Sequence, residues 1–321
     1  RMTPILIATR GSALALAQAN AVLALCRKKF PKLAFDLKII KTTGDKLQTA
    51  APAQAAALAS RGLFTKELEA ALLQRRADLA VHSLKDLPTD LPAGLALGCV
   101  AGEREDVRDV LIYRLDKRLA PKMGLADLPG GLTVATGSAR RKTQLLALRP
   151  DFNTVEIRGN VPTRLRKLAA RPEIHATILA AAGLNRLLLR VSPSGRLLGE
   201  GVPKGLCALV LEPEQMLPCV GQGAVGLEIR EPDERMTEIC RQLDHFETLQ
   251  CVTAERSFLR AMGGGCQTPI GAYARVTGGQ IYLRAVAHLT EKVQRAEGKG
   301  PLSGAAPLGE QVAARLRQGG P

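Results

Sequence analysis

The sequence predicts an α/β protein with two α/β domains in succession and a third, smaller α+β domain. Its 321 residues exceed the roughly 100 to 150 residues of a usual domain, so a single core is not expected. Strand-like apolar runs alternate with helix-like patterns through the first hundred residues, which favours parallel sheets with helical crossovers. The alternation begins again near residue 132 and gives way to a glycine run and alternating strands near the end.

The first domain is predicted from apolar periodicity. The alanine-rich segment 44–62 has little amphipathic pattern, and we expect a mobile surface loop there, a candidate lid. The expected elements are, in order, a strand at 5–8, a helix at 12–29, a strand at 35–41, a helix with Phe64, Leu68 and Leu72 at helical spacing, and a strand at 79–82.

The second domain begins with a strand at 132–135 and a helix at 138–148. Its opening, residues 135–139 (ATGSA), is similar to residues 8–13 (ATRGSA), which stand at the same kind of strand-to-helix junction. The similarity is short, so chance remains an alternative to an internal repeat.

A hinge and the third domain follow. Residues 217–224 are rich in Gly and Pro and suit a hinge about which two domains could close. From His245 onward, a helix through residues 255–262, a glycine run and strands such as 280–287 predict a small α+β domain.

The charge balance indicates an acidic partner. Lys and Arg number 45 against 30 Asp and Glu, a formal charge of +15, which attracts anions. Nucleic acid is the first alternative, but the chain has no Trp, and its nine Phe and Tyr do not cluster with basic residues as a stacking surface requires. A small polyanion fits better. No apolar run approaches the roughly 20 residues that span a bilayer, and we recognise no signal peptide, so we expect a cytoplasmic protein without membrane association.

The cysteines single out one position. The seven cysteines form no Cys-x-x-Cys pair, most lie among apolar residues, and the four histidines lack ligand spacing, so neither disulfides nor a metal are indicated. Cys266 differs because it follows Gly263-Gly264-Gly265, and small neighbours leave room for a bulky attachment. A nucleophile or covalent attachment point is plausible there, although no nearby His suggests a Cys-His protease.

Several cationic residues follow predicted strands. Ser12 and Ser138 are the expected N-caps of two helices, whose free N–H groups bind anions. Arg10 stands beside the first junction, and Arg140 and Arg141 occupy the first turn of the second helix, where two cations oppose the helix dipole unless an anion compensates. A plain solvated face is the alternative.

Other charged residues stand at further turns. Arg158 and Arg164 flank a Gly and Pro turn, and Arg186 follows a strand-like run at 177–182. Because ligands of open α/β sheets lie beyond the carboxyl ends of the strands, these arginines could converge on one cleft and hold carboxylates bidentately. Lys85 and Asp86 end the strand at 79–82, where a surface ion pair or a structural cap is the plain interpretation. Beside an arginine-lined cleft, Asp86 becomes the candidate for acid/base or electrostatic work.

Seven separate motifs occur along the chain in a specific order. They are Ile7-Ala8-Thr9-Arg10, residues 61–69 (RGLFTKELE), residues 80–86 (AVHSLKD), Arg158-Gly159-Asn160, Gly221-Gln222-Gly223-Ala224, Thr253-Ala254-Glu255-Arg256 and residues 264–271 (GGCQTPIG). Together they resemble the porphobilinogen deaminase (hydroxymethylbilane synthase) family over nearly the whole chain.

The resemblance implies a fold and a reaction. Domains 1 and 2 would resemble periplasmic binding proteins, with mainly parallel sheets and the active cleft between them, and domain 3 would carry the cofactor cysteine. We expect residues 1–103 and 222–243 in domain 1, 104–221 in domain 2 and 244–321 in domain 3. The family joins four porphobilinogen molecules into the linear tetrapyrrole hydroxymethylbilane, with loss of ammonia, and is expected to be monomeric.

The resemblance also implies roles for individual residues. Cys266 would carry a dipyrromethane cofactor by a thioether bond, and Asp86 would be catalytic by stabilising the cationic azafulvene that forms as ammonia leaves. Lys85 would bind cofactor carboxylates. The other expected cofactor-binding residues are Ser138, Arg140, Arg141, Arg164 and Arg186, and the expected substrate-binding residues are Arg10, Ser12, Phe64 and Arg158.

Three residues depart from the family pattern: Arg61 for Lys, Gly137 for Ser or Thr, and Cys251 for Arg. The last removes a possible carboxylate contact near the third domain. A periplasmic-type binding module for a dicarboxylate is the alternative from another class, but it leaves the loop at Cys266 and the third domain unexplained. Residues 188–204 have no assigned role.

Overall fold

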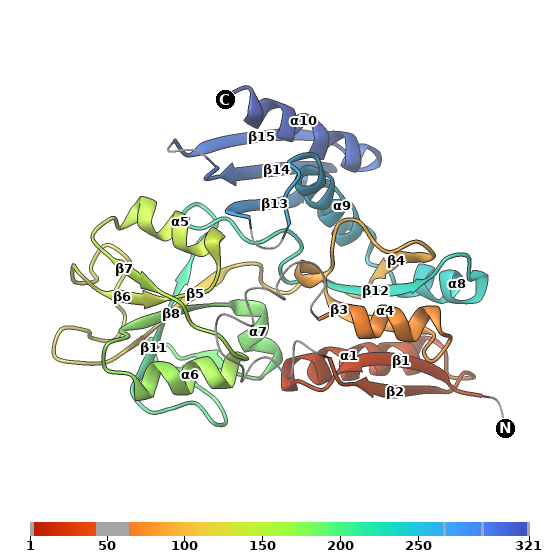
Figure 1. Cartoon of the computed structure of the whole chain (residues 1–321), viewed down its shortest axis with the longest axis horizontal. Coiled ribbons are helices and arrows are strands. Elements are labelled where there is room, and N and C mark those ends of the chain that lie inside the picture. The colour runs from red at the N-terminus through yellow and green to blue at the C-terminus, as the bar shows by residue number, and fades with distance from the viewer. Residues whose placement is uncertain (1–2, 43–63, 266–267, 290–291, 320–321) are drawn as a thin grey trace.

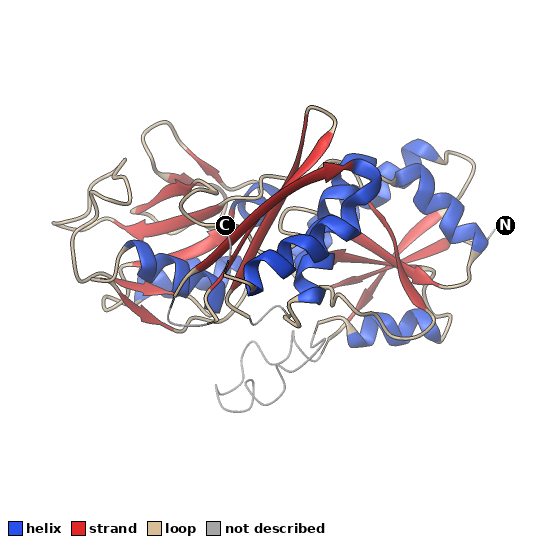
Figure 2. Cartoon of the chain, turned by 90° about the horizontal axis from the view of Figure 1, so that it is seen from above, coloured by secondary structure: helices blue, strands red, loops and turns tan. Residues whose placement is uncertain are grey.

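The structure is a computed structural model that describes residues 3–42, 64–265, 268–289 and 292–319. Two five-stranded sheets with helices lie side by side, and a three-stranded sheet with two helices lies above their junction (Figure 1). From above, the C-terminal strands cross over that junction (Figure 2). The predicted α/β class with a small C-terminal α+β unit is confirmed. The predicted loop at 44–62 lies outside the described residues.

The first sheet has the strand order β2-β1-β3-β12-β4. β1 is parallel to β2 and β3, whereas β12 is antiparallel to β3 and β4. Side chains of α1 and α8 fill one face of this sheet, and Leu68 and Leu72 of α4 pack on the other. The strands are β1 (Ile5–Arg10), β2 (Phe35–Ile40), β3 (Leu79–Ser83), β4 (Leu95–Val100) and β12 (Val225–Arg230), and the helices are α1 (Ala13–Lys29), α4 (Lys66–Leu73) and α8 (Glu234–Leu243).

The second sheet has the order β11-β5-β8-β6-β7. β6 is parallel to β7 and β8, and β5 is antiparallel to β8 and β11. Leu145 of α5 packs on one face, and Leu165 and Leu168 of α6 pack on the other. The elements are β5 (Asp109–Arg114), β6 (Thr133–Ala135), α5 (Ala139–Leu148), β7 (Asn153–Val155), α6 (Val161–Ala170), β8 (Ala176–Ala180), α7 (Ala181–Arg186) and β11 (Leu206–Leu211).

The two sheets repeat one arrangement. When the second sheet is read from β7 to β11, the fourth strand of each sheet, β12 or β5, follows a crossover from the other sheet and runs antiparallel to both neighbours. The similar segments 8–13 and 135–139 occupy equivalent places, because each runs from the end of the second strand, counted in the same direction, into the start of a helix. The short sequence similarity therefore marks an internal structural repeat rather than chance.

Two segments of chain join the sheets: residues 101–108 lead from β4 to β5, and residues 212–224 lead from β11 to β12. We call them the crossover segments. They lie against each other, since Glu105 N donates to the Gly223 carbonyl (3.1 Å) and Gln222 Nε2 donates to the Val107 carbonyl (2.8 Å). Gly223 has φ +87°, and a side chain there would collide with the Glu105 carbonyl, so the close approach requires glycine.

The C-terminal unit is an antiparallel sheet of β13 (Ile270–Thr277), β14 (Gln280–Ala287) and β15 (Gln294–Pro301), in that order. Side chains of α9 (Phe246–Ala261) and α10 (Ala305–Arg317) pack with these strands in one core that includes Phe258 and Val312. His245 is the N-cap of α9, as its side chain accepts a hydrogen bond from Thr248 N.

Two local predictions were wrong. The strand-like run 177–182 ends at Ala180, and its last two residues begin α7, so Arg186 ends a short helix rather than following a turn. The Gly and Pro turn after Arg158 is the start of α6, with Asn160 as N-cap and Pro162 in its first turn, a usual place for proline. The unassigned residues 188–204 contain a short hairpin of β9 (Arg190–Val191) and β10 (Leu197–Leu198).

Candidate functional site

Both predicted serine caps are confirmed. Ser12 Oγ accepts a hydrogen bond from Ala15 N at 3.3 Å, and Ser138 Oγ accepts one from Arg141 N at 3.4 Å. Each cap follows the carboxyl end of an inner strand, β1 or β6, so each helix starts at the carboxyl end of the parallel strands of its sheet. Such starts favour anions, although contact of Ser12 and Ser138 with a ligand remains a prediction.

Arg140 and Arg141 surround a buried carboxylate, Asp109, that the sequence analysis did not identify. Arg140 Nη1 donates to Asp109 Oδ2 at 2.7 Å, and Arg141 Nη2 donates to Asp109 Oδ1 at 2.8 Å. All three side chains are buried. Burial alone would raise the pKa of Asp109, but the two guanidinium cations outweigh it and hold that pKa well below its usual range. The anion that compensates two cations in the first turn of α5 is thus part of the protein itself.

Gln222 connects this cluster to the first sheet. Its side-chain nitrogen donates to Asp109 Oδ1 at 3.1 Å, and its oxygen accepts a hydrogen bond from Lys85 Nζ at 3.4 Å. Gln222 is itself buried and belongs to a crossover segment. One amide therefore links Lys85 of the first sheet to Asp109 of the second.

Asp86 lies in a group of cations from both sheets. It is exposed at the end of a single 3-10 turn, η1 (Leu84–Asp86), directly after β3. Burial lowers the pKa of Lys85, and the Arg141 cation lowers it further, while Asp86 raises it. Burial and Arg141 also lower the pKa of Arg164 to about 10, again opposed by Asp86. Lys85 and Arg164 are therefore each close enough to both Asp86 and Arg141 for their charges to interact.

The remaining predicted arginines are spread around this group. Arg158 pairs with Glu156 at 2.6 Å, Arg164 Nε donates to the Gly159 carbonyl at 2.7 Å, and Arg186 Nη2 donates to the Gly223 carbonyl at 2.6 Å. Burial lowers the pKa of Arg186. Within the described part of the chain, neither Arg164 nor Arg186 has a carboxylate at ion-pair distance.

Arg10 and Phe64 contact each other at the edge of the first sheet. The guanidinium carbon of Arg10 lies 4.1 Å from the centroid of the Phe64 ring, a cation–π contact between the end of β1 and the residue two before α4. This contact fixes the Arg10 head group at the junction that Ser12 caps.

The cation group suits a ligand with several carboxylates. Cations that lower one another's pKa are relieved by added negative charge, and guanidinium groups bind carboxylates in a fork. The cations that could hold the carboxylates of a polycarboxylate cofactor are Lys85, Arg141, Arg164 and Arg186. Arg141 would do so while it also pairs with Asp109. The predicted attachment residue, Cys266, lies outside the described residues, but the preceding Gly263–Gly265 loop follows directly after α9.

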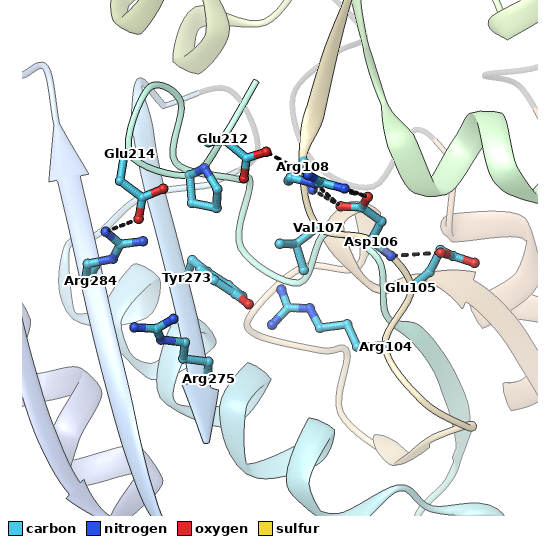
Figure 3. A pocket seen from close by; sticks show the side chains of 11 residues that line it. Arg104, Glu105, Asp106, Val107, Arg108, Glu212, Glu214, Tyr273, Arg275 and Arg284 are labelled. Carbon is cyan, nitrogen blue, oxygen red and sulfur yellow. Dashed lines mark hydrogen bonds and ion pairs between the residues drawn. The ribbon is translucent and has the colours of Figure 1, made fainter. Parts of the chain in front are cut away.

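A pocket of about 420 Å³ lies elsewhere, between the crossover segments and the C-terminal sheet (Figure 3). None of the predicted site residues that the structure describes lines it. Its charged side chains are largely paired with each other: Arg108 with Asp106 and Glu212, each at 2.7 Å, and Arg284 with Glu214 at 2.9 Å. The pocket thus lies where the crossover segments meet the C-terminal sheet, and Asp86 remains the predicted catalytic residue.

The fold and the site define a class of α/β protein with two repeated units and a largely cationic group of side chains drawn from both. The comparisons with known proteins then specify it: the chain belongs to the porphobilinogen deaminase family. Residues 5–238 match the family model described as porphobilinogen deaminase, dipyromethane cofactor binding domain, and residues 249–318 match the model of the C-terminal domain. The protein is thus an enzyme of the transferase class that acts in tetrapyrrole biosynthesis with a dipyrromethane cofactor.

Similar proteins cover almost the full length. Porphobilinogen deaminase of Desulforudis audaxviator is 44% identical over 318 residues, which are 98% of this chain and 95% of that protein. The Thermus thermophilus protein of the same name is 43% identical over 323 residues, 99% of this chain and 97% of that one. The periplasmic aliphatic sulphonate binding protein SsuA of Escherichia coli is 13% identical, with a TM-score of 0.40 over 82% of this chain and 71% of its own. Among the described residues, no helix is long and apolar enough to cross a membrane.

Proposed function

We propose that the protein condenses four porphobilinogen molecules into the linear tetrapyrrole hydroxymethylbilane, on a dipyrromethane primer attached through the sulfur of Cys266. One observation carries the proposal: the exposed Asp86 carboxylate lies among Lys85, Arg141 and Arg164, which come from both sheets. When bound, the primer supplies the free pyrrole carbon to which the first substrate is joined.

The cations bind and orient the substrate. Each porphobilinogen carries an acetate and a propionate, so a chain of pyrroles adds two negative charges per unit and needs many cationic partners. Arg10, Ser12, Phe64 and Arg158 are proposed for the incoming substrate. Lys85, Ser138, Arg140, Arg141, Arg164 and Arg186 are proposed for the primer. Arg140 and Arg141 hold Asp109 as well, so they act partly by keeping the start of α5 cationic and rigid.

Asp86 is proposed to stabilise the positive charge that develops during the reaction. As the carbon–nitrogen bond of the substrate aminomethyl group breaks and ammonia leaves, positive charge develops on the pyrrole. The substrate methylene carbon would then be joined to the free pyrrole carbon that the primer supplies when bound, and the proton displaced from that carbon would pass to the released ammonia or to water. A carboxylate beside the pyrrole N–H stabilises the positive charge at both stages, which is charge stabilisation by a fixed group. Asp86 is the proposed catalytic residue.

The finer organisation forms part of the proposal. We divide the chain into residues 1–103 with 222–243, residues 104–221 and residues 244–321, and the place of β12 inside the first sheet supports the first unit. We also propose a monomer that acts in the cytoplasm without nucleic acid or membrane partners. Size-exclusion chromatography with light scattering tests the monomer.

Intact mass spectrometry with peptide mapping tests the proposed function. The purified protein is expected to carry, on the peptide containing Cys266, a mass equal to two porphobilinogen units less two ammonia. Cys266→Ala is expected to lack it, whereas Cys26→Ala, which removes a buried thiol in the core of the first sheet, is expected to retain it. An unmodified wild-type protein is next incubated with porphobilinogen, and failure to gain the mass or to turn over substrate contradicts the proposal.

A further inference from the structure

The turn that carries Asp86 is held from outside by helix α9. Arg256, on α9, donates from Nη1 to the Leu87 carbonyl at 2.9 Å and from Nη2 to the Pro88 carbonyl at 2.6 Å. These two carbonyls directly follow Asp86. Arg256 is buried, being 8% exposed, and its hydrogen bond to Leu87 is shielded from water, while the one to Pro88 is partly so. The guanidinium group of Arg256 therefore binds two successive backbone carbonyls next to the proposed catalytic carboxylate.

The turn has little structure of its own to hold it. η1 is a single 3-10 turn, closed by Leu87 N donating to the Leu84 carbonyl at 3.1 Å. One further backbone bond, Leu84 N to the Ala224 carbonyl at 3.0 Å, ties its start to the crossover segment. Short 3-10 turns have poor hydrogen-bond geometry and depend on their surroundings. The position of Asp86 thus depends on contacts with residues outside the turn. Arg256 provides such a contact through its hydrogen bonds to the carbonyls of the two residues after Asp86.

The same helix leads to the proposed attachment point of the primer. α9 ends at Ala261, five residues after Arg256, a rise of about 7.5 Å along the axis. The Gly263–Gly265 loop follows immediately and precedes Cys266. The last part of α9, from Arg256 to Ala261, therefore connects the turn that carries Asp86 to the start of the loop proposed to hold the primer.

We propose that Arg256 is a positioning residue, which fixes Asp86 relative to the primer attachment loop by clamping the Leu87 and Pro88 carbonyls to α9. The proposal rests on the proposed function for the identity of the reaction, but the clamp itself is a separate structural claim. The planar guanidinium group of Arg256 is essential, because a lysine ammonium cannot hold two successive carbonyls in the same geometry.

Arg260 provides a matched control. It lies one turn later on α9, and it also bonds the segment after Asp86, through Asp90 Oδ1 at 2.9 Å and the Thr89 carbonyl at 2.5 Å. Its side chain is 54% exposed, and its contacts lie three and four residues beyond Asp86. If general packing between α9 and this segment were what matters, replacement of either arginine would lower activity. If positioning of Asp86 is what matters, only replacement of Arg256 would do so.

The experiment compares holoenzymes of the wild type, Arg256→Lys and Arg260→Gln. We expect Arg256→Lys to lower kcat at least tenfold with KM within threefold and with the primer mass unchanged, and Arg260→Gln to keep kcat within twofold. Hydrogen–deuterium exchange should become faster in residues 84–90 of Arg256→Lys and remain unchanged in Arg260→Gln. A kcat within twofold of wild type in Arg256→Lys, unchanged exchange in residues 84–90, or loss of the primer together with activity overturns the proposal.

A second variant, Pro88→Gly, tests the proposal if Arg256→Lys does not fold. Pro88→Gly loosens the same turn without touching α9, because it removes the fixed φ of proline. It is expected to lower kcat with KM preserved, and an unchanged kcat counts against the clamp. If the wild type has no turnover with porphobilinogen, the proposed function fails, whereas the exchange of residues 84–90 still decides whether Arg256 holds the turn.

Discussion

Replacement of Asp109 by Asn is expected to destabilise the second α/β unit strongly. The carboxylate is fully buried and accepts hydrogen bonds from Arg140 (2.7 Å), Arg141 (2.8 and 3.0 Å) and Gln222 (3.1 Å). An amide has the same size but no charge, so the substitution leaves two buried guanidinium groups without a counter-ion. Breaking a buried pair by removal of one partner costs about 3 to 5 kcal/mol, and we expect the free energy of unfolding to fall by that amount.

The effect has a defined pH dependence. The folded-state pKa of Asp109 is held below the ordinary value of 3.8. A depressed carboxyl pKa contributes stability that is complete above the unfolded pKa and is lost as the pH falls toward the folded pKa. The difference between the wild type and Asp109→Asn is therefore expected to be full at pH 7 and to shrink progressively below about pH 3.8.

Urea unfolding followed by far-ultraviolet circular dichroism measures the difference. Asp151→Asn is the control, because Asp151 forms an ion pair of the same length with Arg149 (2.7 Å) but at the surface, where no measurable change is expected. Asp109→Asn with the stability of the control at pH 7 would refute the reasoning, since it would mean that the buried guanidinium groups need no internal anion.

Three further predictions concern the site. Asp86→Asn is expected to keep the fold and the primer mass but to lower turnover by at least a hundredfold, because an amide cannot balance a cation. Asp90→Asn, in the same exposed segment, should stay near wild type in the same assay, and comparable turnover in both would count against Asp86. Arg164→Gln is expected to raise KM for porphobilinogen or reduce primer assembly, whereas Arg166→Gln on the same helix should do neither; equal kinetics in the two would remove Arg164 from the site. Ser12→Ala is expected to lower the free energy of unfolding by about 1 kcal/mol through loss of the cap on α1, and an unchanged urea midpoint would contradict that role.

Local patterns in the sequence predicted the local structure well. The apolar run at 5–8, the helix at 12–29 and the cap at Ser138 depend on residues close in the chain, and the structure confirms them within one or two residues. The start of α6 differs from the prediction, because Gly159 and Pro162 favour a turn as well as a helix start. Asn160 followed by Pro162 also fits an N-cap and a first-turn proline, so the information was present in the sequence.

Long-range partners could not be predicted in the same way. Asp109 lies 31 residues before Arg140, and the pairing depends on how β5 enters the second sheet. Two cations in the first turn of α5 indicate that an anion is nearby, but no local pattern shows that Asp109 rather than a ligand supplies it. The clamp of Arg256 on Leu87 spans 169 residues, and no periodicity or motif indicates it.

The paired crossover segments limit how the two sheets can move. A body attached by one flexible link can swing in many directions, whereas two links side by side leave one easy degree of freedom, rotation about the line that passes through both. Twisting or sliding would pull Gln222 from the Val107 carbonyl and Glu105 from Gly223. Space for each added pyrrole is therefore expected to open along a single coordinate, like a clamshell, so that Lys85 and Arg164 separate by steps along one path while the primer stays attached.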